Sequence, residues 1–146
     1  MSRTPNRLAH WQRRTLYATG GLLLASGALW LALHYGVGAG AGELPHPLEA
    51  WAMRVHGLAG FAALFMLGVL AAAHVPHGWR ISGRLRWAGQ RRSGVILCSL
   101  GAALVLSGYL LYYFAPDPIR PALGWVHAAA GLGMALLLLS HRRREP

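Results

Sequence analysis

The chain consists mainly of long apolar stretches that alternate with short polar connections. Four stretches are long enough to cross a bilayer, because a membrane-spanning helix needs about 20 mainly apolar residues. They cover residues 16–35, 51–75, 94–114 and 123–140. These stretches use most of the 146 residues, so no length remains for a separate soluble domain. The pattern predicts an all-α fold, a single integral-membrane four-helix bundle over residues 1–146.

The composition agrees with a chain that lies in lipid. Hydrophobic residues make up 55% of the sequence and charged residues only 12%, about half the charged fraction that soluble domains average. The net charge of +10 would also fit a nucleic-acid-binding protein. However, the basic charges recur in separate groups between the apolar stretches, and nucleic-acid binding would leave that alternation unexplained. We therefore predict contact with membrane lipid and none with nucleic acid.

The arginines predict the orientation of the helices. All 14 basic residues are arginines, and short arginine-rich connections stay on the cytoplasmic side of a membrane. Twelve of them form three groups that precede the first stretch, separate the second from the third, and follow the fourth: Arg3, Arg7, Arg13, Arg14, Arg80, Arg84, Arg86, Arg91, Arg92, Arg142, Arg143 and Arg144. These three positions share one side of a four-helix bundle, so we expect both termini to be cytoplasmic.

Four histidines lie near the ends of the second and fourth stretches: His56, His74, His127 and His141. A titratable group inside a membrane span is costly, and it usually marks a functional site. His56 and His74 are 18 residues apart, and His127 and His141 are 14 apart. These separations are close to about five and four whole turns of an α-helix. We therefore expect the two histidines of each stretch to share one helix face.

The four histidines form two pairs in this prediction. Tryptophans near His56 and His127 mark the outer interface, so His56 pairs with His127 there and His74 with His141 at the inner end. Each pair offers two axial nitrogens to one haem iron. Covalent c-type haem is excluded because the sequence has no C-x-x-C-H motif. We expect two b-type haems, of which the outer is better supported, because the rise between histidines is about 27 Å on the second stretch and about 21 Å on the fourth.

Other interpretations of the histidines stay open. A histidine at a helix end also lies in water or among lipid headgroups without any ligand. His10, His34 and His46 lack a partner at the same depth, and we expect them to face solvent. His77 lies about one turn beyond His74 and is a substitute ligand for the inner site.

Small and basic residues extend the predicted site. A helix approaches the flat face of a porphyrin closely only where its side chains are small, although ordinary helix packing in lipid also favours glycine. The glycines predicted to line haem are Gly57, Gly60, Gly101 and Gly131. Arg54 and Arg120 lie near the outer histidines, where a guanidinium group can pair with haem propionates or extend to the headgroups.

The segments around the histidines resemble a known pattern. They contain Val55-His-Gly-Leu-Ala-Gly-Phe, Ala73-His-Val-Pro-His-Gly-Trp-Arg, Trp125-Val-His-Ala-Ala-Ala-Gly and Ser140-His-Arg. This pattern resembles small bacterial diheme b-type membrane cytochromes, which include cytochrome b561-like and formate dehydrogenase gamma-subunit-like four-helix proteins. The resemblance covers all four stretches. It implies that the four histidines ligate haem and that the chain is a multi-pass protein of the bacterial inner (cytoplasmic) membrane.

Bis-histidine haem predicts the class of function. Iron with two axial histidines has no open coordination position, which favours electron transfer over oxygen chemistry. We expect transmembrane electron transfer between the quinone pool and a redox partner protein, either a cytochrome c or an oxidoreductase subunit. Iron–sulfur, flavin and molybdenum motifs are absent from the sequence, so we expect a subunit or carrier rather than a complete enzyme. Two alternatives stay open: a haem-free membrane anchor or assembly subunit, and a small metal or solute transporter.

Overall fold

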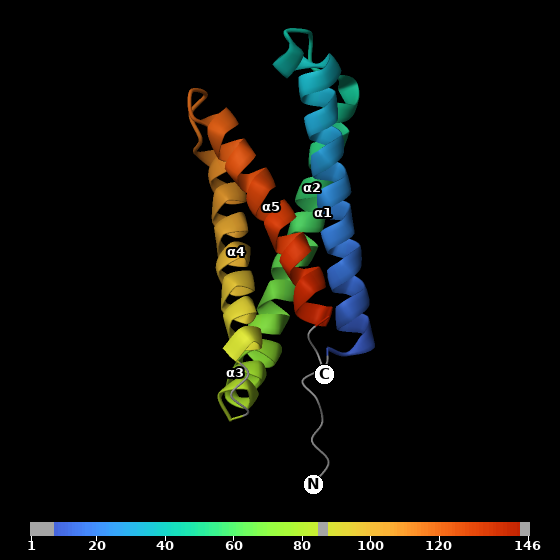
Figure 1. The fold of residues 1–146 in the computed structure, drawn as a ribbon. Coiled ribbons are helices and arrows are strands. Elements are labelled where there is room, and N and C mark those ends of the chain that lie inside the picture. The colour runs from blue at the N-terminus through green and yellow to red at the C-terminus, as the bar shows by residue number, and fades with distance from the viewer. Residues whose placement is uncertain (1–7, 85–87, 144–146) are drawn as a thin grey trace. The chain divides into compact units, whose positions relative to one another are not determined.

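The computed structural model describes residues 8–84 and 88–143, and in these ranges the chain is helical apart from short connections (Figure 1). The elements in chain order are α1 (His10–Val37), the 3₁₀ turn η1 (Ala39–Ala41), α2 (Pro47–Val69), the π-helical turn η2 (Leu70–His74), α3 (Val75–Arg84), α4 (Ala88–Tyr113) and α5 (Arg120–Arg143). The all-α prediction is confirmed.

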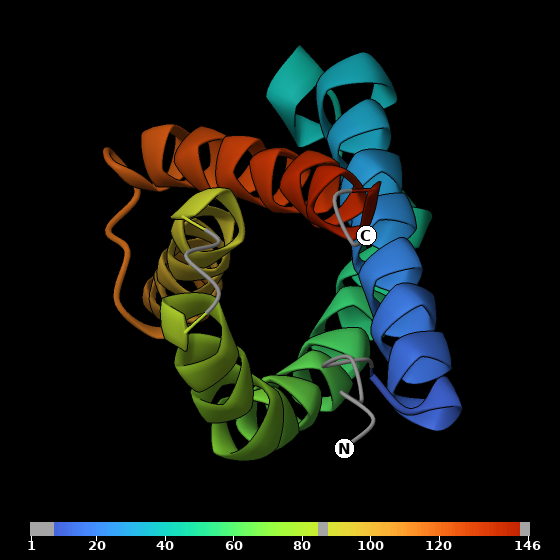
Figure 2. The ribbon, with the colours of Figure 1, turned by 60° about the horizontal axis from the view of Figure 1, so that its bottom comes forward.

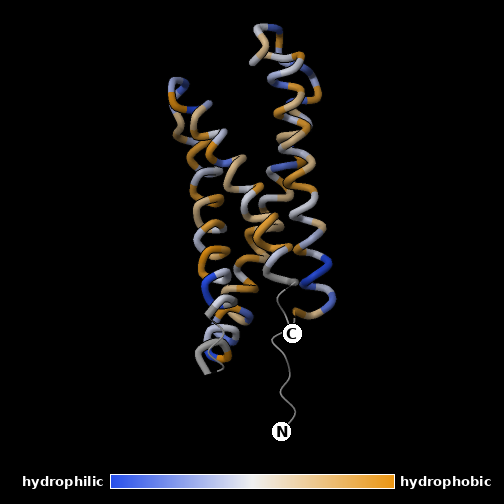
Figure 3. Tube along the Cα trace, viewed as in Figure 1, coloured by the Kyte–Doolittle hydropathy of each residue, from blue (hydrophilic) through white to orange (hydrophobic). Residues whose placement is uncertain are grey.

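Four helical segments are long and apolar enough to cross a membrane. They are His10–Ala41, Pro47–Ile81, Arg91–Tyr113 and Arg120–Ser140, with mean hydropathies between 1.6 and 2.1. Figure 3 shows that hydrophobic residues dominate the middle of each helix, while hydrophilic residues gather mainly toward the ends. The prediction of a multi-pass membrane protein with four spans is therefore confirmed at the level of length and composition.

The chain divides into two compact units. The first contains α1, η1 and α2 as far as Gly68, and the second contains η2, α3, α4 and α5. In the first unit, α1 and α2 form an antiparallel pair that we call the first hairpin. In the second unit, α4 and α5 form an antiparallel pair that we call the second hairpin (Figures 1 and 2).

Mostly small side chains, together with Met66, form the packing face of the first hairpin. On α2, the buried residues Ala52, Ala59 and Met66 are spaced by seven positions, which is about two helical turns and places them on one face. On α1, the buried residues Thr19 and Ser26 show the same spacing. Small residues at such positions let two helix backbones approach closely, which stabilises helix pairs in lipid.

The two hairpins turn in different ways. The first uses η1 and the left-handed residue Gly42, whose φ of 86° favours glycine. The second uses the short segment from Ala115 to Ile119, in which Arg120 Nη2 donates to the Ala115 carbonyl at 2.7 Å. The Arg120 backbone N–H also donates to the Pro116 carbonyl at 3.0 Å. These bonds satisfy backbone groups that begin and end the two helices.

The region between the second and third predicted spans differs from the prediction. We expected a loop containing five arginines, but α2 continues through η2 into α3, which ends at Arg84, and α4 begins at Ala88. Arg80 and Arg84 therefore lie on α3, and Arg91 and Arg92 lie on α4. Arg86 is outside the described residues.

The π-helical turn also corrects the predicted geometry of the second span. In η2, the Val75 backbone N–H donates to the Leu70 carbonyl, five residues back instead of four. Pro76 follows directly; it has no N–H for the Ala72 carbonyl, and its ring crowds that carbonyl in a regular helix. The wider turn relieves this crowding. The assumption of a regular α-helix from His56 to His74 is therefore wrong over its last five residues.

Candidate functional site

His56 lies on α2 and is half-buried against α1. Its Nδ1 atom is 3.0 Å from the hydroxyl oxygen of Ser26. The next residue on α1 is Gly27, and a Cβ added there would lie 3.4 Å from Cε1 and 3.5 Å from Nδ1 of His56. One edge of the imidazole therefore packs directly against the α1 backbone, where serine supplies the hydrogen bond and glycine supplies the space.

His127 lies on α5 and has the same surroundings in the second hairpin. It is half-buried, and its Nδ1 atom is 2.7 Å from the hydroxyl oxygen of Ser107 on α4. A Cβ added at Gly108 would lie 3.5 Å from Cε1 of the His127 ring. The two histidines are therefore held by equivalent Ser-Gly pairs, although they belong to different units of the chain.

The equivalence extends to the sequence. The first helix of each hairpin carries Leu-x-x-Ser-Gly, at 23–27 and at 104–108. The second carries Val-His-x-x-Ala-Gly, at 55–60 and at 126–131. The sequence-based prediction identified the histidines but missed the serines. The shared Leu-x-x-Ser-Gly pattern was the signal that could have revealed them.

The residues of the predicted inner pair are less fully described. His74 is the last residue of the π-helical turn and is half-buried, while His77 on α3 is exposed. His141 lies in the last turn of α5, but its side chain is outside the described part of the structure. The inner pairing therefore stays a prediction.

A multi-residue metal cluster is not present among the described residues. Within 8–84 and 88–143, no three or more His, Cys, Asp or Glu side chains are grouped so that they could hold a metal ion. A haem iron makes a smaller demand on the protein, because the porphyrin supplies four ligands and the chain supplies one or two. The chemistry of His56 and His127, each an imidazole oriented through Nδ1, fits an axial haem ligand.

The predicted arginines contact residues close to them in sequence. The Arg54 guanidinium lies 4.8 Å from the centre of the Trp51 ring, which is cation–π contact. Arg120 binds the Ala115 carbonyl, and its Nε lies 3.7 Å from Oδ1 of the exposed Asp117. Both side chains are exposed, so propionate pairing stays a prediction for them.

The predicted glycines fall into two groups. A Cβ at Gly57 or Gly60 would meet nothing within 4 Å, so these positions leave open space beside α2. Gly101 is buried on α4, and a Cβ at Gly131 would lie 3.8 Å from the Leu104 side chain. Gly131 therefore packs against α4, and the prediction that these glycines line haem stays a prediction.

His34 does not face solvent as predicted. Its Nδ1 donates to Glu49 Oε2 at 2.9 Å, and its ring stacks on Trp30 with a centroid distance of 4.4 Å. Glu49 is buried and also accepts the His46 backbone N–H at 2.9 Å. The prediction missed this pair because it considered only histidine partners at the same depth, whereas the partner is the carboxylate of Glu49 on the first turn of α2. His10 is exposed as predicted, whereas His46 is half-buried and its Nδ1 accepts the Leu48 N–H.

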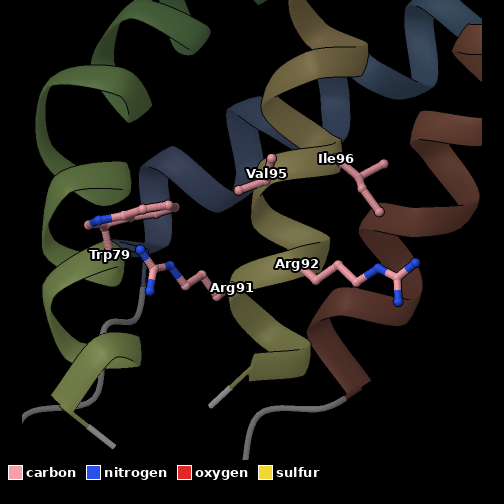
Figure 4. A pocket seen from close by; sticks show the side chains of 5 residues that line it. All are labelled: Trp79, Arg91, Arg92, Val95 and Ile96. Atoms are coloured by element: carbon pink, nitrogen blue, oxygen red, sulfur yellow. The ribbon is translucent and has the colours of Figure 1, made fainter. Parts of the chain in front are cut away.

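An aromatic and basic depression lies between α3 and α4. It is lined by Trp79, Arg91, Arg92, Val95 and Ile96. Figure 4 shows the Arg91 side chain directed at the Trp79 ring and Arg92 directed away from it. The Arg91 guanidinium lies 3.6 Å from the ring centre, so a cation–π contact joins α3 to the first turns of α4. Among the described residues, no histidine lines this depression.

No family model, curated protein or solved structure matches the chain. The resemblance to diheme b-type membrane cytochromes therefore stays a prediction based on the motifs around the histidines. The established description is the coarser one, an all-α protein with four helices long and apolar enough to cross a membrane.

Proposed function

We propose that the protein transfers electrons across a membrane as a b-type cytochrome, with His56 and His127 as axial ligands of a haem. One observation carries the proposal. Each hairpin places one half-buried imidazole on an apolar helix and orients it by a hydrogen bond between Nδ1 and a serine hydroxyl of the neighbouring helix. Metal-binding histidines are held in this way, by a partner on the nitrogen that does not ligate the metal.

In this proposal His56 and His127 would hold one haem, as the sequence pattern predicts. With two histidine ligands the iron would have no open coordination position, which favours electron transfer over oxygen binding. A second haem between His74 and His141 belongs to the same proposal. His74 supports it by lying at the end of a π-helical turn, a local structure that is frequent at functional sites.

Haem supplies one-electron redox chemistry, and the protein sets where it lies and how strongly it holds the electron. In this proposal the two histidines bind the iron, and the apolar helix surfaces exclude water from it. The arginine distribution supports cytoplasmic termini, and the motifs around the histidines support a bacterial inner membrane. A membrane quinone and a soluble or subunit redox partner, such as a cytochrome c, are the proposed donor and acceptor.

The test is a difference spectrum of protein purified in detergent after expression with haem available. Reduction with dithionite should produce a sharp b-type α-band, and His127→Ala should remove the contribution of the outer haem. His10→Ala is the matched control, because His10 is exposed and is not a proposed ligand. A colourless wild type would contradict the proposal and favour an anchor, whereas metal-dependent uptake without the band would favour a transporter.

A further inference from the structure

We infer that Ser26 and Ser107 are positioning residues, which fix His56 and His127 in the tautomer that carries its proton on Nδ1. The lone pair then lies on Nε2, and Nε2 is the nitrogen that each ring offers to a metal. The inference about tautomers concerns the chain alone. Its consequence for haem rests on the proposed function.

The proton count at Ser26 determines the direction of the hydrogen bond. A serine hydroxyl has one proton to donate and two lone pairs that accept. Ser26 Oγ lies 2.6 Å from the Leu22 carbonyl, which only accepts, so the hydroxyl proton is used there. The remaining contact, 3.0 Å to His56 Nδ1, therefore needs its proton from the imidazole. A neutral imidazole that donates from Nδ1 is unprotonated at Nε2.

Ser107 repeats the arrangement in the second hairpin. Its hydroxyl oxygen lies 3.3 Å from the Leu104 carbonyl and 2.7 Å from His127 Nδ1. The carbonyl contact is longer than the usual range of about 2.5–3.0 Å for a hydroxyl donor, so the bond direction at His127 is assigned from its equivalence with His56 and not from distances alone. The same assignment then holds for both histidines.

The glycine after each serine explains how the contact becomes so close. At Gly27 and Gly108, an added Cβ would lie 3.4–3.5 Å from ring atoms of the histidine, so a longer side chain would displace the ring. The serine thus fixes the proton, and the glycine lets the imidazole reach the serine. The serine and the glycine are both needed to fix the orientation of the ring, and with it the direction of Nε2.

The repetition argues against chance contact. Ser26 and His56 are 30 residues apart, whereas Ser107 and His127 are only 20 apart, because the hairpin connections differ. Nevertheless both hairpins bring Ser-Gly to the Nδ1 edge of Val-His-x-x-Ala-Gly. The structure thus contains the same arrangement twice, a Ser-Gly pair on one helix that contacts a histidine on the next helix.

The direct test uses haem-free protein. In ¹⁵N NMR spectra of histidine-labelled protein in detergent, His56 and His127 should show a protonated Nδ1 and an unprotonated Nε2. Ser26→Ala and Ser107→Ala should each abolish this pattern at one histidine only. Thr19→Val and Ser140→Ala are matched controls, since these hydroxyls bond only to carbonyls of their own helices in the described structure. A proton on Nε2 at either wild-type histidine would overturn the inference.

The haem-loaded protein gives the second readout. Removing a hydrogen-bond partner from a ligating histidine lowers its basicity and weakens metal binding by about 10-fold to 100-fold. Ser26→Ala should therefore weaken haem binding by at least about tenfold and raise the midpoint potential of the remaining haem. Unchanged affinity and potential in both serine variants would overturn the positioning role. If the wild type binds no haem but shows the Nδ1 tautomer, the proposed function fails while the tautomer assignment stands.

Discussion

The imidazole of His34 donates from Nδ1 to Oε2 of Glu49 at 2.9 Å, and this bond joins the end of α1 to the start of α2. The other carboxylate oxygen accepts the His46 backbone N–H at the beginning of α2. One buried carboxylate thus satisfies a side chain on α1 and a backbone donor before α2. A polar contact therefore connects the two helices of the first hairpin at this end, in addition to the Ser26–His56 contact along its length.

Replacing Glu49 by alanine should lower the thermal stability of the protein. The change leaves the His34 imidazole and the His46 N–H without their acceptor, and removing one partner of a buried hydrogen bond costs more than removing both. Glu43→Ala is the control, because Glu43 is an exposed carboxylate in the same connection. Thermal unfolding in detergent checks the prediction. Equal melting temperatures for the two variants would contradict the assigned role of Glu49.

Replacing Gly38 by alanine should destabilise the same end of the first hairpin. An added Cβ would overlap Oε1 of Glu49 and would lie 2.9 Å from the Leu33 carbonyl oxygen. Overpacking of this kind costs about 1–3 kcal/mol of unfolding free energy. Gly36→Ala is the matched control, since a Cβ there meets nothing within 4 Å. Denaturant unfolding of both variants should show a loss of stability for Gly38→Ala only.

Replacing Gly27 by leucine should displace the His56 ring. The Cβ alone would reach van der Waals distance from the imidazole, so the rest of a leucine side chain has no space unless the ring moves. We expect haem content to fall in this variant. Gly21→Leu on the same helix is the control, because Gly21 is exposed and its Cβ would meet nothing within 4 Å. A haem content equal to that of the control would argue that the Gly27–His56 contact is unimportant for ligation.

The orientation of the chain provides a prediction that needs no haem. Arginine-rich connections remain in the cytoplasm. A reporter that is active only in the cytoplasm should therefore be active when it is fused to either end of the chain. A reporter inserted after Gly42, in the first connection, should show the opposite result. Cytoplasmic activity at Gly42 would contradict the predicted orientation.

The sequence predicted the four spans well because the thickness of a bilayer is a strong physical requirement. Twenty or so apolar residues in a row have few alternatives to a spanning helix. Hydropathy located the third and fourth spans to within three residues at each end. The first two helical segments extend four to six residues beyond the predicted ends, because their polar ends, such as Glu49, continue the helix.

Local chemistry inside the helices was harder to predict. Ser26 and Ser107 are two of several serines on apolar helices, and a serine there usually bonds only to its own backbone. Their second contact, to a histidine, depends on which helix faces pack together. The π-helical turn before Pro76 was also missed, because periodicity analysis assumes regular rotation through every residue. The histidines were selected as candidate ligands because an imidazole within an apolar span is rare.

Haem content per polypeptide tests the central claim most directly. Protein expressed with haem available, purified in detergent and assayed for haem against total protein should contain two haems per chain, and reduction should produce the α-band of b-type haem. If the protein contains one haem, and both His56→Ala and His127→Ala lose it, the outer site is supported and the inner site is contradicted. A chain without haem would contradict the account of His56 and His127 as axial ligands.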